Sequence, residues 1–562
     1  MILVGALSWS LTMVKSGVVY SYGMGFWGPN GHDGVWHLSI INGLARGSLE
    51  MPVFADEDIR NYHIGFDLLT ASLNRVTGIP TQLLYFQVLP PVLALLIGFL
   101  TYLFVLRWRK SKTQALWSTF FVYFGGSFGW MVTMFRTWEV GGESLFWSQQ
   151  AISTLLNPPF AVSLLLLLLL CVLLPKYEGG SSRPGLAKLK LGVSLVVVFA
   201  LVGQIKVYSG VLAFAGLGSL GVLGLFRKRL DYLFIFLFSV LLSGILFFPL
   251  NKNASSLVVF QPFWFLETMM AVSDRVYWPR FYEAMITYKM ADVWHKAIGT
   301  YGAAFLIFAA GNLGTRILGI WEVAKRFRKA RAGRDFGEID VFLLSVAAGG
   351  VFLPMIFLQK GTPWNTIQFF YYSLFVFSIY SGIFVGKLWE IRRRYGKALV
   401  AAVILLTIPS SYSTLKHYIP SRPPAKISVN ELAALGFLKK QPAGVVLTYP
   451  FDRRAAEDAV ANPPRPLYLY ESTAYVSAFS RKTVFLEDEV NLDIMGYHWK
   501  TRRQEVLDWL DTLDQEKAYS FLRENNISYI YWVKGQRARV GEGQWGGRRI
   551  FANEEVEIFE VN

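Results

Sequence analysis

Long apolar runs constrain this chain of 562 residues more than any other feature of its sequence. A run of about 17 to 25 apolar residues has the length of a helix that crosses a bilayer. Charged residues make up 17% of the chain, against about 25% in soluble proteins. The sequence therefore predicts an α-helical polytopic membrane protein with about eleven transmembrane helices, at 2–19, 82–106, 114–135, 152–174, 191–205, 207–226, 232–250, 297–320, 339–358, 367–386 and 398–414.

Lysine and arginine residues gather in the loops that follow the even-numbered runs. Cytoplasmic loops are enriched in these residues, so we expect the N-terminus and these loops in the cytoplasm and the C-terminus outside it. Basic loops beside anionic lipid then explain the net charge of +16. We expect membrane lipid as a partner and no nucleic acid. The basic loops are 107–112, 176–190, 227–229, 325–334 and 387–397.

The chain after the last apolar run has the pattern of a water-soluble, extracytoplasmic α/β domain. The stretch PSRPPAK forms a linker, and Ser428 with Glu431 has the capping-box pattern of a helix start. The segments GVVLTYP, KTVFLED and SYIYWV are strand-like, and TRRQEVLDWLDTL and DQEKAYSFLRENN are helix-like. We predict a transmembrane domain at 1–415, which includes a first extracytoplasmic loop at 20–81, and a soluble domain at 427–562.

The first extracytoplasmic loop carries the most informative polar residues. The turn-forming sequence GPNG precedes Asp33 and His37, which lie on one face if 33–46 is a helix. This carboxylate and imidazole are candidates for catalysis and binding. The alternatives are that Asp33 caps the helix and that His37 is an ordinary interface histidine. The same loop contains three further polar candidates, for which a solvated patch is the alternative: Asp56, Asn61 and His63.

Other polar residues gather at the outer ends of the predicted helices. Glu143 lies in the loop after the third run, and Lys206 and Tyr208 lie between two short runs. An ammonium group in the bilayer interior costs free energy, and amides in a membrane helix need partners. The segment FLQKGTPWNTIQFFYY adds Lys360, Asn365, Gln368 and Tyr372 to these polar residues. The lysines and their polar neighbours either bind an anionic substrate or form polar contacts at the interface and between helices. For Glu143 a catalytic role is the hypothesis, and a solvated loop that ends one helix and begins the next is the alternative.

These groups suit the transfer of a sugar from a lipid phosphate. A carboxylate deprotonates an attacking hydroxyl, and cationic or hydrogen-bonding groups stabilise a phosphate leaving group. His37, Lys206 and Lys360 are candidates for the second role. The sequence has no Walker A, Rossmann, HExxH or serine-nucleophile motif, which argues against an ATP-driven pump and a zinc protease.

Four short patterns connect the sequence with a known superfamily: NYH at 61–63, GGSFGW at 125–130, NPPF at 157–160 and WNTIQFFYY at 364–372. Together with the long first outer loop, its early acid and the outer C-terminal domain, they make the chain resemble the GT-C membrane glycosyltransferases. That superfamily includes protein O-mannosyltransferases, lipid A aminoarabinose transferases and catalytic subunits of oligosaccharyltransferase. The patterns are similar to those of a bacterial and archaeal subgroup, which implies a location in the plasma membrane of a prokaryote.

The resemblance implies a hexosyl- or pentosyltransferase that uses a polyprenyl-phosphate or polyprenyl-diphosphate sugar donor and builds a cell-envelope glycan. The acceptor is a glycan, a lipid or a protein. By position, Asp33 matches the early loop acid that acts as base or orients the acceptor, Glu139 or Glu143 matches a second acid, and Asp56 is the remaining candidate. In some families an Asp-Glu pair stands at the first position, whereas here Gly34 follows Asp33. Both a requirement for Mg²⁺ or Mn²⁺ and the absence of any cofactor therefore stay open.

Two other functions are alternatives. A lipid or polysaccharide transporter, or a flippase, predicts pseudo-repeats and charged residues through the membrane midplane, whereas the polar groups here gather at the outer boundary. A catalytically inactive relative would instead bind glycan or protein through its outer domain.

Overall fold

The computed structural model describes residues 1–178, 185–252, 258–330, 336–391, 394–460, 462–533, 535–541 and 543–561. Its residues form two compact units. The helical unit comprises Met1–Thr12, Pro90–Pro249 and Asn253–Tyr418, and the mixed unit comprises Met13–Leu89, Leu250–Lys252 and Ile419–Asn562. Five basic residues of the predicted cytoplasmic loops lie outside the described residues: Arg183, Arg331, Arg334, Arg392 and Arg393.

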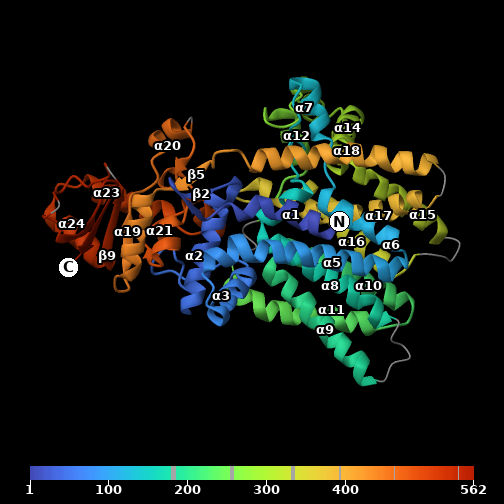
Figure 1. Ribbon diagram of the computed structural model, residues 1–562, viewed down its shortest axis with the longest axis horizontal. Helices are drawn as coiled ribbons and strands as arrows, with labels where there is room; N and C mark the ends of the chain where they lie inside the picture. Colours follow the sequence, from blue (N-terminus) through green and yellow to red (C-terminus); the bar gives the residue numbers. More distant parts are fainter. Residues whose placement is uncertain are drawn as a thin grey trace. The chain divides into compact units, whose positions relative to one another are not determined.

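Apolar helices make up most of the helical unit (Figure 1). Within the described residues, nine helical stretches are long and apolar enough to cross a membrane, and the chain is an integral membrane protein. The stretch from Trp294 to Lys329 consists of two helices joined by a short 3₁₀ turn. The helices are α5 (Leu89–Arg109), α8 (Pro158–Glu178), α9 (Gly185–Ile205), α10 (Val207–Phe226), α11 (Asp231–Phe247), α14 (Trp294–Leu313) with α15 (Ile317–Ala330), α16 (Glu338–Ile356), α17 (Gln368–Glu390) and α18 (Arg394–Tyr418).

Two shorter apolar helices stand where the first and third predicted runs begin, α1 (Ile2–Val14) and α6 (Lys112–Phe124). The third run, 114–135, is not one helix, because it breaks at Gly125 and resumes as α7 (Gly129–Thr137). A Cβ on Gly126 would lie 2.2 Å from the Ser410 side chain, so the break lets the backbone approach α18 closely. The fourth run also begins later than predicted, at Pro158, after a 3₁₀ turn.

The helical unit packs around α17, which contacts α6, α15 and α16. Small side chains allow this close approach: Ser373 Oγ donates to the Ala347 carbonyl at 2.7 Å, and a Cβ on Gly382 would meet the backbone of Ser118 at 2.1 Å. Small residues are the common packing device between membrane helices. The remaining elements of this unit are α12 (Trp264–Ala271), α13 (Pro279–Met290) and the antiparallel pair β3 (Val258–Phe260) and β4 (Phe357–Gln359).

A five-stranded sheet forms the core of the mixed unit, in the order β10-β11-β9-β6-β8. The strands β6 (Val445–Thr448), β8 (Thr483–Val484) and β9 (Ile527–Val533) run parallel, while β10 (Gly547–Ala552) and β11 (Val556–Val561) form an antiparallel hairpin at one edge. The three predicted strands are confirmed as β6, β8 and β9. The helices of this part are α19 (Val429–Lys440), α20 (Arg453–Val460), α21 (Tyr475–Ser480), α22 (Glu489–Met495), α23 (Trp499–Asp511) and α24 (Gln515–Glu524).

The first outer loop belongs to the mixed unit rather than to the helical one, which differs from the division predicted from sequence. Its strands β1 (Val18–Tyr20) and β2 (Gly23–Phe26) continue through β5 (Ala425–Ile427) to β7 (Arg465–Pro466) in one sheet. Met24 pairs with Ile427, and the Val484 backbone N–H donates to the Pro52 carbonyl at 2.8 Å. These backbone bonds hold the loop helices α2 (Asp33–Arg46) and α3 (Gly65–Thr77) in the unit that contains the C-terminal α/β fold (Figure 1).

Candidate active site

Asp33 opens α2, directly after the 3₁₀ turn Gly28–Gly31. The N-cap position belongs to His32, so Asp33 is the first helical residue and not the cap residue. Its side chain is 57% exposed and its Oδ1 lies 2.8 Å from His32 Nδ1. The positive end of the helix dipole favours a charged carboxylate at this position. The arrangement gives a solvent-accessible anion with an imidazole partner, which suits a proton acceptor.

A second carboxyl group, that of Asp488, interacts electrostatically with the pair formed by His32 and Asp33. Burial lowers the pKa of His32, but the charge and hydrogen bond of Asp33 and the charge of Asp488 outweigh it, so the net shift is upward. Burial raises the pKa of Asp488 to about 6, with Asp33 adding to the rise and His32 opposing it. The ionisable groups of His32, Asp33 and Asp488 come from two distant parts of the sequence, and their charges interact within the mixed unit.

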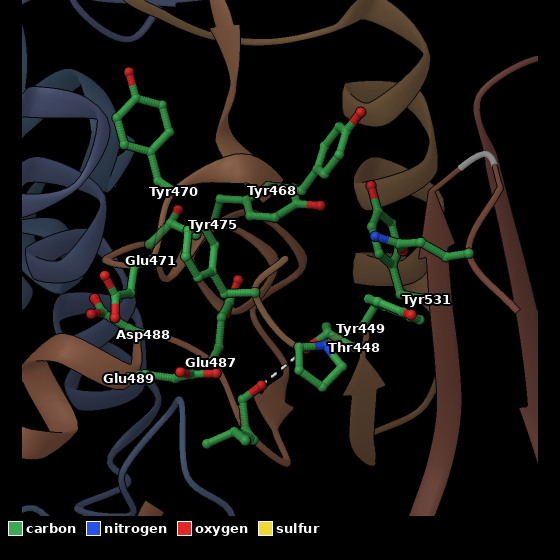
Figure 2. Close-up of a pocket in the computed structure, with 15 residues that line it drawn as sticks. Thr448, Tyr449, Tyr468, Tyr470, Glu471, Tyr475, Glu487, Asp488, Glu489 and Tyr531 are labelled. Carbon is green, nitrogen blue, oxygen red and sulfur yellow. Dashed lines mark hydrogen bonds between the residues drawn. The ribbon is translucent and has the colours of Figure 1, made fainter. Parts of the chain in front are cut away.

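Asp488 also lines a solvent-open hollow of about 470 Å³ in the mixed unit. Figure 2 shows tyrosine rings and carboxyl groups around this hollow, with the Thr448 hydroxyl donating to the Leu486 carbonyl at 3.0 Å. We call it the tyrosine pocket. Its lining includes five tyrosines and four acidic residues: Tyr449, Tyr468, Tyr470, Tyr475, Tyr531, Glu471, Glu487, Asp488 and Glu489.

The four acidic residues of the tyrosine pocket have different structural roles. Glu487 accepts the backbone N–H groups of Val476 and Ser477 at 2.8 and 3.1 Å, and burial raises its pKa to about 8. Asp488 caps α22 by accepting from the Asn491 backbone N–H at 3.2 Å. Glu489 forms an ion pair with an arginine of α23, and Glu471 is exposed to solvent. Glu471 is therefore the most accessible carboxylate of this wall.

His37 lies in the mixed unit and is paired with Asp67 of α3, which sequence reasoning did not identify. His37 Nδ1 lies 2.7 Å from Asp67 Oδ1, and the Tyr62 hydroxyl lies 3.2 Å from the same nitrogen. Asp67 is fully buried and the imidazole stacks on Tyr85, with ring centroids 5.6 Å apart. The ring of His37 therefore pairs with α3, while Asp33 pairs with His32.

The remaining candidates of the first outer loop join that loop to the C-terminal part of the mixed unit. Asn61 donates its side-chain amide to the Met495 carbonyl at 2.8 Å. Asp56 is exposed at a turn with a φ of 65°, one residue after Ala55, whose N–H donates to Val484 at 3.1 Å. The His63 ring stacks on Tyr62, with centroids 5.1 Å apart. The hydrogen bond of Asn61 favours a structural role for that residue, whereas the Asp56 side chain is exposed to solvent.

Glu143 lies in the helical unit, in the loop between α7 and α8. The loop turns at Gly142, which has a φ of +82° and packs so tightly on Gly129 that a Cβ would meet its backbone at 2.4 Å. The Glu143 carboxyl group accepts from the Thr414 hydroxyl at 2.6 Å and from the Gln150 N–H at 3.3 Å. Burial raises its pKa to about 7, even though these bonds lower it. A carboxyl group of this kind exchanges its proton near neutral pH.

Lys206 and Tyr208 come together in the helical unit. Lys206 is buried at the N-cap of α10, with its Nζ 5.5 Å from the centre of the Tyr208 ring. The Tyr208 hydroxyl donates to Gln359 at 2.9 Å, and the residue after Gln359 is Lys360, which is exposed. These two predicted lysines are therefore in the same part of the helical unit.

Three other predicted residues of the helical unit form contacts between elements. Gln368 accepts from the Asn157 amide at 3.3 Å, and the Tyr372 hydroxyl lies 2.7 Å from the Ser163 hydroxyl. Asn365 donates to the Thr362 hydroxyl at 3.0 Å. These contacts favour the alternative that sequence analysis left open, in which this segment forms polar bridges within the helix bundle.

Sequence reasoning missed Asp67 and Asp488, although each had a signal. Asp67 is in the first turn of an amphipathic helix. Asp488 is the last residue of the strand-like KTVFLED, and in parallel sheets functional side chains gather beyond the carboxyl ends of strands. Across the described residues, no three His, Cys, Asp or Glu side chains gather as a set that could hold a metal ion.

The structure is similar to a crystal structure of the oligosaccharyltransferase of Archaeoglobus fulgidus, tethered to an acceptor peptide containing the NVT sequon. The TM-score is 0.50 at 11% sequence identity, over 95% of this chain and 68% of the other. The chain has the GT-C fold. The fold expected from the resemblance is thereby confirmed.

ArnT from Cupriavidus metallidurans bound to undecaprenyl phosphate is also similar, with a TM-score of 0.39 and 10% identity over 99% of this chain and 96% of that one. No protein-family model and no curated protein sequence matches the chain.

Proposed function

We propose that the protein is a membrane glycosyltransferase that moves a sugar from a polyprenyl-phosphate or polyprenyl-diphosphate carrier to an acceptor on the extracytoplasmic face. One observation carries this proposal: an exposed carboxylate at a helix start, paired with an imidazole, in the same electrostatic environment as a carboxyl group of the tyrosine pocket. The GT-C fold supports it, because a polytopic helical unit suits a lipid-linked substrate.

Asp33 is the proposed base. As the acceptor hydroxyl oxygen attacks the anomeric carbon, its proton passes to the Asp33 carboxylate, and the bond between that carbon and the carrier's phosphate oxygen breaks. The phosphate leaves with the electron pair, and one such displacement inverts the anomeric centre. His32 then acts on Asp33 by orienting the carboxylate through Nδ1. General-base catalysis of this kind contributes about 10²- to 10⁴-fold.

The test is a transfer assay on the purified full-length protein in lipid nanodiscs, with a panel of polyprenyl-phosphate sugars and total cell-envelope glycan as acceptor. We expect one donor of the panel to lose its sugar in a protein-dependent way. Failure of every donor, with a protein that is folded and monodisperse, would contradict the proposal.

A second candidate function, lipid or polysaccharide transport, is favoured by Arg316. This arginine is buried in the helical unit, where it donates to the carbonyls of Leu313 and Asn312 at 3.1 and 2.7 Å. A buried charge in a membrane helix often marks a substrate path. The two functions differ in an assay of lipid movement across liposomes: a flippase translocates a fluorescent polyprenyl-phosphate analogue in the absence of any acceptor, whereas a transferase does not.

A further inference from the structure

The tyrosine pocket has the wall chemistry of a saccharide site. The rings of Tyr449, Tyr468 and Tyr470 are half-buried and line it (Figure 2). Arg465 covers the Tyr470 ring at 3.4 Å from its centre, and the Tyr470 hydroxyl donates to Pro424 at 3.2 Å. Tyrosine presents a rigid apolar face with a polar end, which suits a sugar ring that has C–H groups on its faces and hydroxyls at its edge.

An unsatisfied polar group on the same wall indicates that the pocket is built for a polar ligand. The Thr473 hydroxyl is buried and has no hydrogen-bond partner within the described residues, and the residue itself is 6% exposed. Buried polar atoms are rarely left unpaired in native proteins because desolvation without a hydrogen bond costs free energy. A ligand hydroxyl in the hollow would supply that bond.

The charge of the wall narrows the class of ligand. Four acidic side chains line the pocket, and among the described lining residues none is lysine, arginine or histidine. A wall without a cationic side chain offers phosphate and acidic sugars no ion pair, while its exposed Glu471 accepts hydrogen bonds from hydroxyl groups. An uncharged saccharide suits the aromatic rings, the carboxyl groups and the described lining without cationic side chains. It has faces that stack on the rings, hydroxyl donors for the carboxylates and no negative charge.

We propose that the tyrosine pocket binds an uncharged saccharide, and that this saccharide is the acceptor of the transfer reaction. The role as acceptor rests on the proposed function, whereas the binding does not. Two observations connect the pocket with the proposed base. Gly31, the residue before His32, packs against Leu467, the residue before Tyr468 of the pocket, so closely that a Cβ would lie 3.2 Å from the Leu467 side chain. The charge of Asp488, which lines the pocket, also acts on His32, the partner of Asp33. A saccharide in the pocket would therefore have hydroxyl groups near the proposed base.

Binding is measured with three neutral probes, mannotriose, cellotriose and N,N′-diacetylchitobiose, by saturation-transfer NMR on the full-length protein in nanodiscs. We expect at least one probe to bind, with affinity reduced about tenfold by Tyr468→Ala. Loss of one hydrogen bond reduces binding about three- to tenfold, so Glu471→Gln and Thr473→Val should each have an effect of that size. Tyr519→Ala removes an exposed ring from α24, outside the pocket, and serves as the matched control with unchanged binding.

Glu471 is exposed, so Glu471→Gln keeps the fold and remains informative if Tyr468→Ala does not fold. The inference is overturned if none of the three probes binds at millimolar concentration, if the pocket variants bind as the wild type does, or if a lysine-rich peptide displaces the probe-binding signal completely.

Asp33→Asn separates the two proposals. In this variant we expect transfer to be lost while probe binding persists. A wild-type protein that binds a probe but transfers no sugar contradicts the proposed function alone, and transfer that is unaffected by the pocket variants contradicts the acceptor role alone.

Discussion

His37 Nδ1 donates to Asp67 Oδ1 across 2.7 Å, and this buried pair joins α2 to α3 within the mixed unit. The carboxylate can only accept, so the proton lies on Nδ1, and the pair fixes the orientation of the imidazole. The histidine four residues after Asp33 is therefore held by a neighbouring helix, and Asp33 remains exposed beside His32.

Removing the Asp67 carboxylate should destabilise the mixed unit. We expect Asp67→Ala to lower the free energy of unfolding by about 2 kcal/mol, the usual contribution of a buried hydrogen bond to a charged group. His37→Ala should have a similar effect. The free energy of unfolding of the double variant should be no lower than that of the less stable single variant, because the two residues act through one bond. Chemical unfolding monitored by tryptophan fluorescence measures this coupling, and additive effects would show that the pair is not energetically linked.

The stability of the mixed unit should fall as pH rises from about 5 to 8. Burial raises the pKa of Glu487 from 4.5 to about 8, so the folded protein holds this proton over a range in which the unfolded chain has released it. That stabilisation is complete below pH 4.5 and is lost as the pH rises through 8. Thermal unfolding across this range checks the slope. Glu487→Gln should flatten it, and an unchanged slope in that variant would assign the effect to another group.

The sequence predicted the helical content well and the assignment of the first outer loop poorly. Apolar runs such as 232–250 are long enough to dictate a helix by themselves, and Ser428 with Glu431 confirms the predicted capping box through a 3.0 Å bond. By contrast, Met24 pairs with Ile427 across some 400 intervening positions, and no local pattern encodes such a strand pairing. The break after α6 escaped prediction for a similar reason, since it depends on contact with Ser410.

In the candidate site too, local features could be predicted from the sequence, and contacts between distant residues could not. Asp33 and the helix that begins there could be predicted from a turn sequence and a periodic pattern, because both are local. Its neighbour Asp488 could not, because the two meet only through the fold of the mixed unit. Asp67 was missed because a single carboxylate in a helix is ordinarily solvated, and only the structure reveals its burial.

The lysines of the helical unit are proposed to bind the phosphate of the donor. Lys360→Ala should weaken the binding of a polyprenyl phosphate about tenfold, since it removes an exposed ammonium near Tyr208 and Gln359. Lys206→Ala should act in the same direction. Lys296→Ala, which removes an exposed lysine from α14, is the matched control. Fluorescence titration with a labelled polyprenyl phosphate measures the affinities, and wild-type affinity in both variants would rule out the assignment.

The orientation in the membrane is predicted from the basic loops alone. Alkaline phosphatase, which is active only outside the cytoplasm, should be active when fused after Asn562 and silent when inserted at residue 333. A cytoplasmic reporter should give the opposite pattern. If the two fusions report the reverse, the mixed unit faces the cytoplasm, and transfer from an extracytoplasmic carrier is excluded.

The role of Asp33 as the base is tested most directly by the initial rate of sugar transfer in Asp33→Asn, measured beside Asp56→Asn. Asparagine keeps the size of the side chain but cannot take up the proton, and the side chain of Asp33 is exposed, so the fold should be retained. We predict a fall of about 10²-fold or more in Asp33→Asn, with unchanged thermal stability, and a rate near that of the wild type in Asp56→Asn. A near-wild-type rate in Asp33→Asn would contradict the account and direct the search for the base to Glu143.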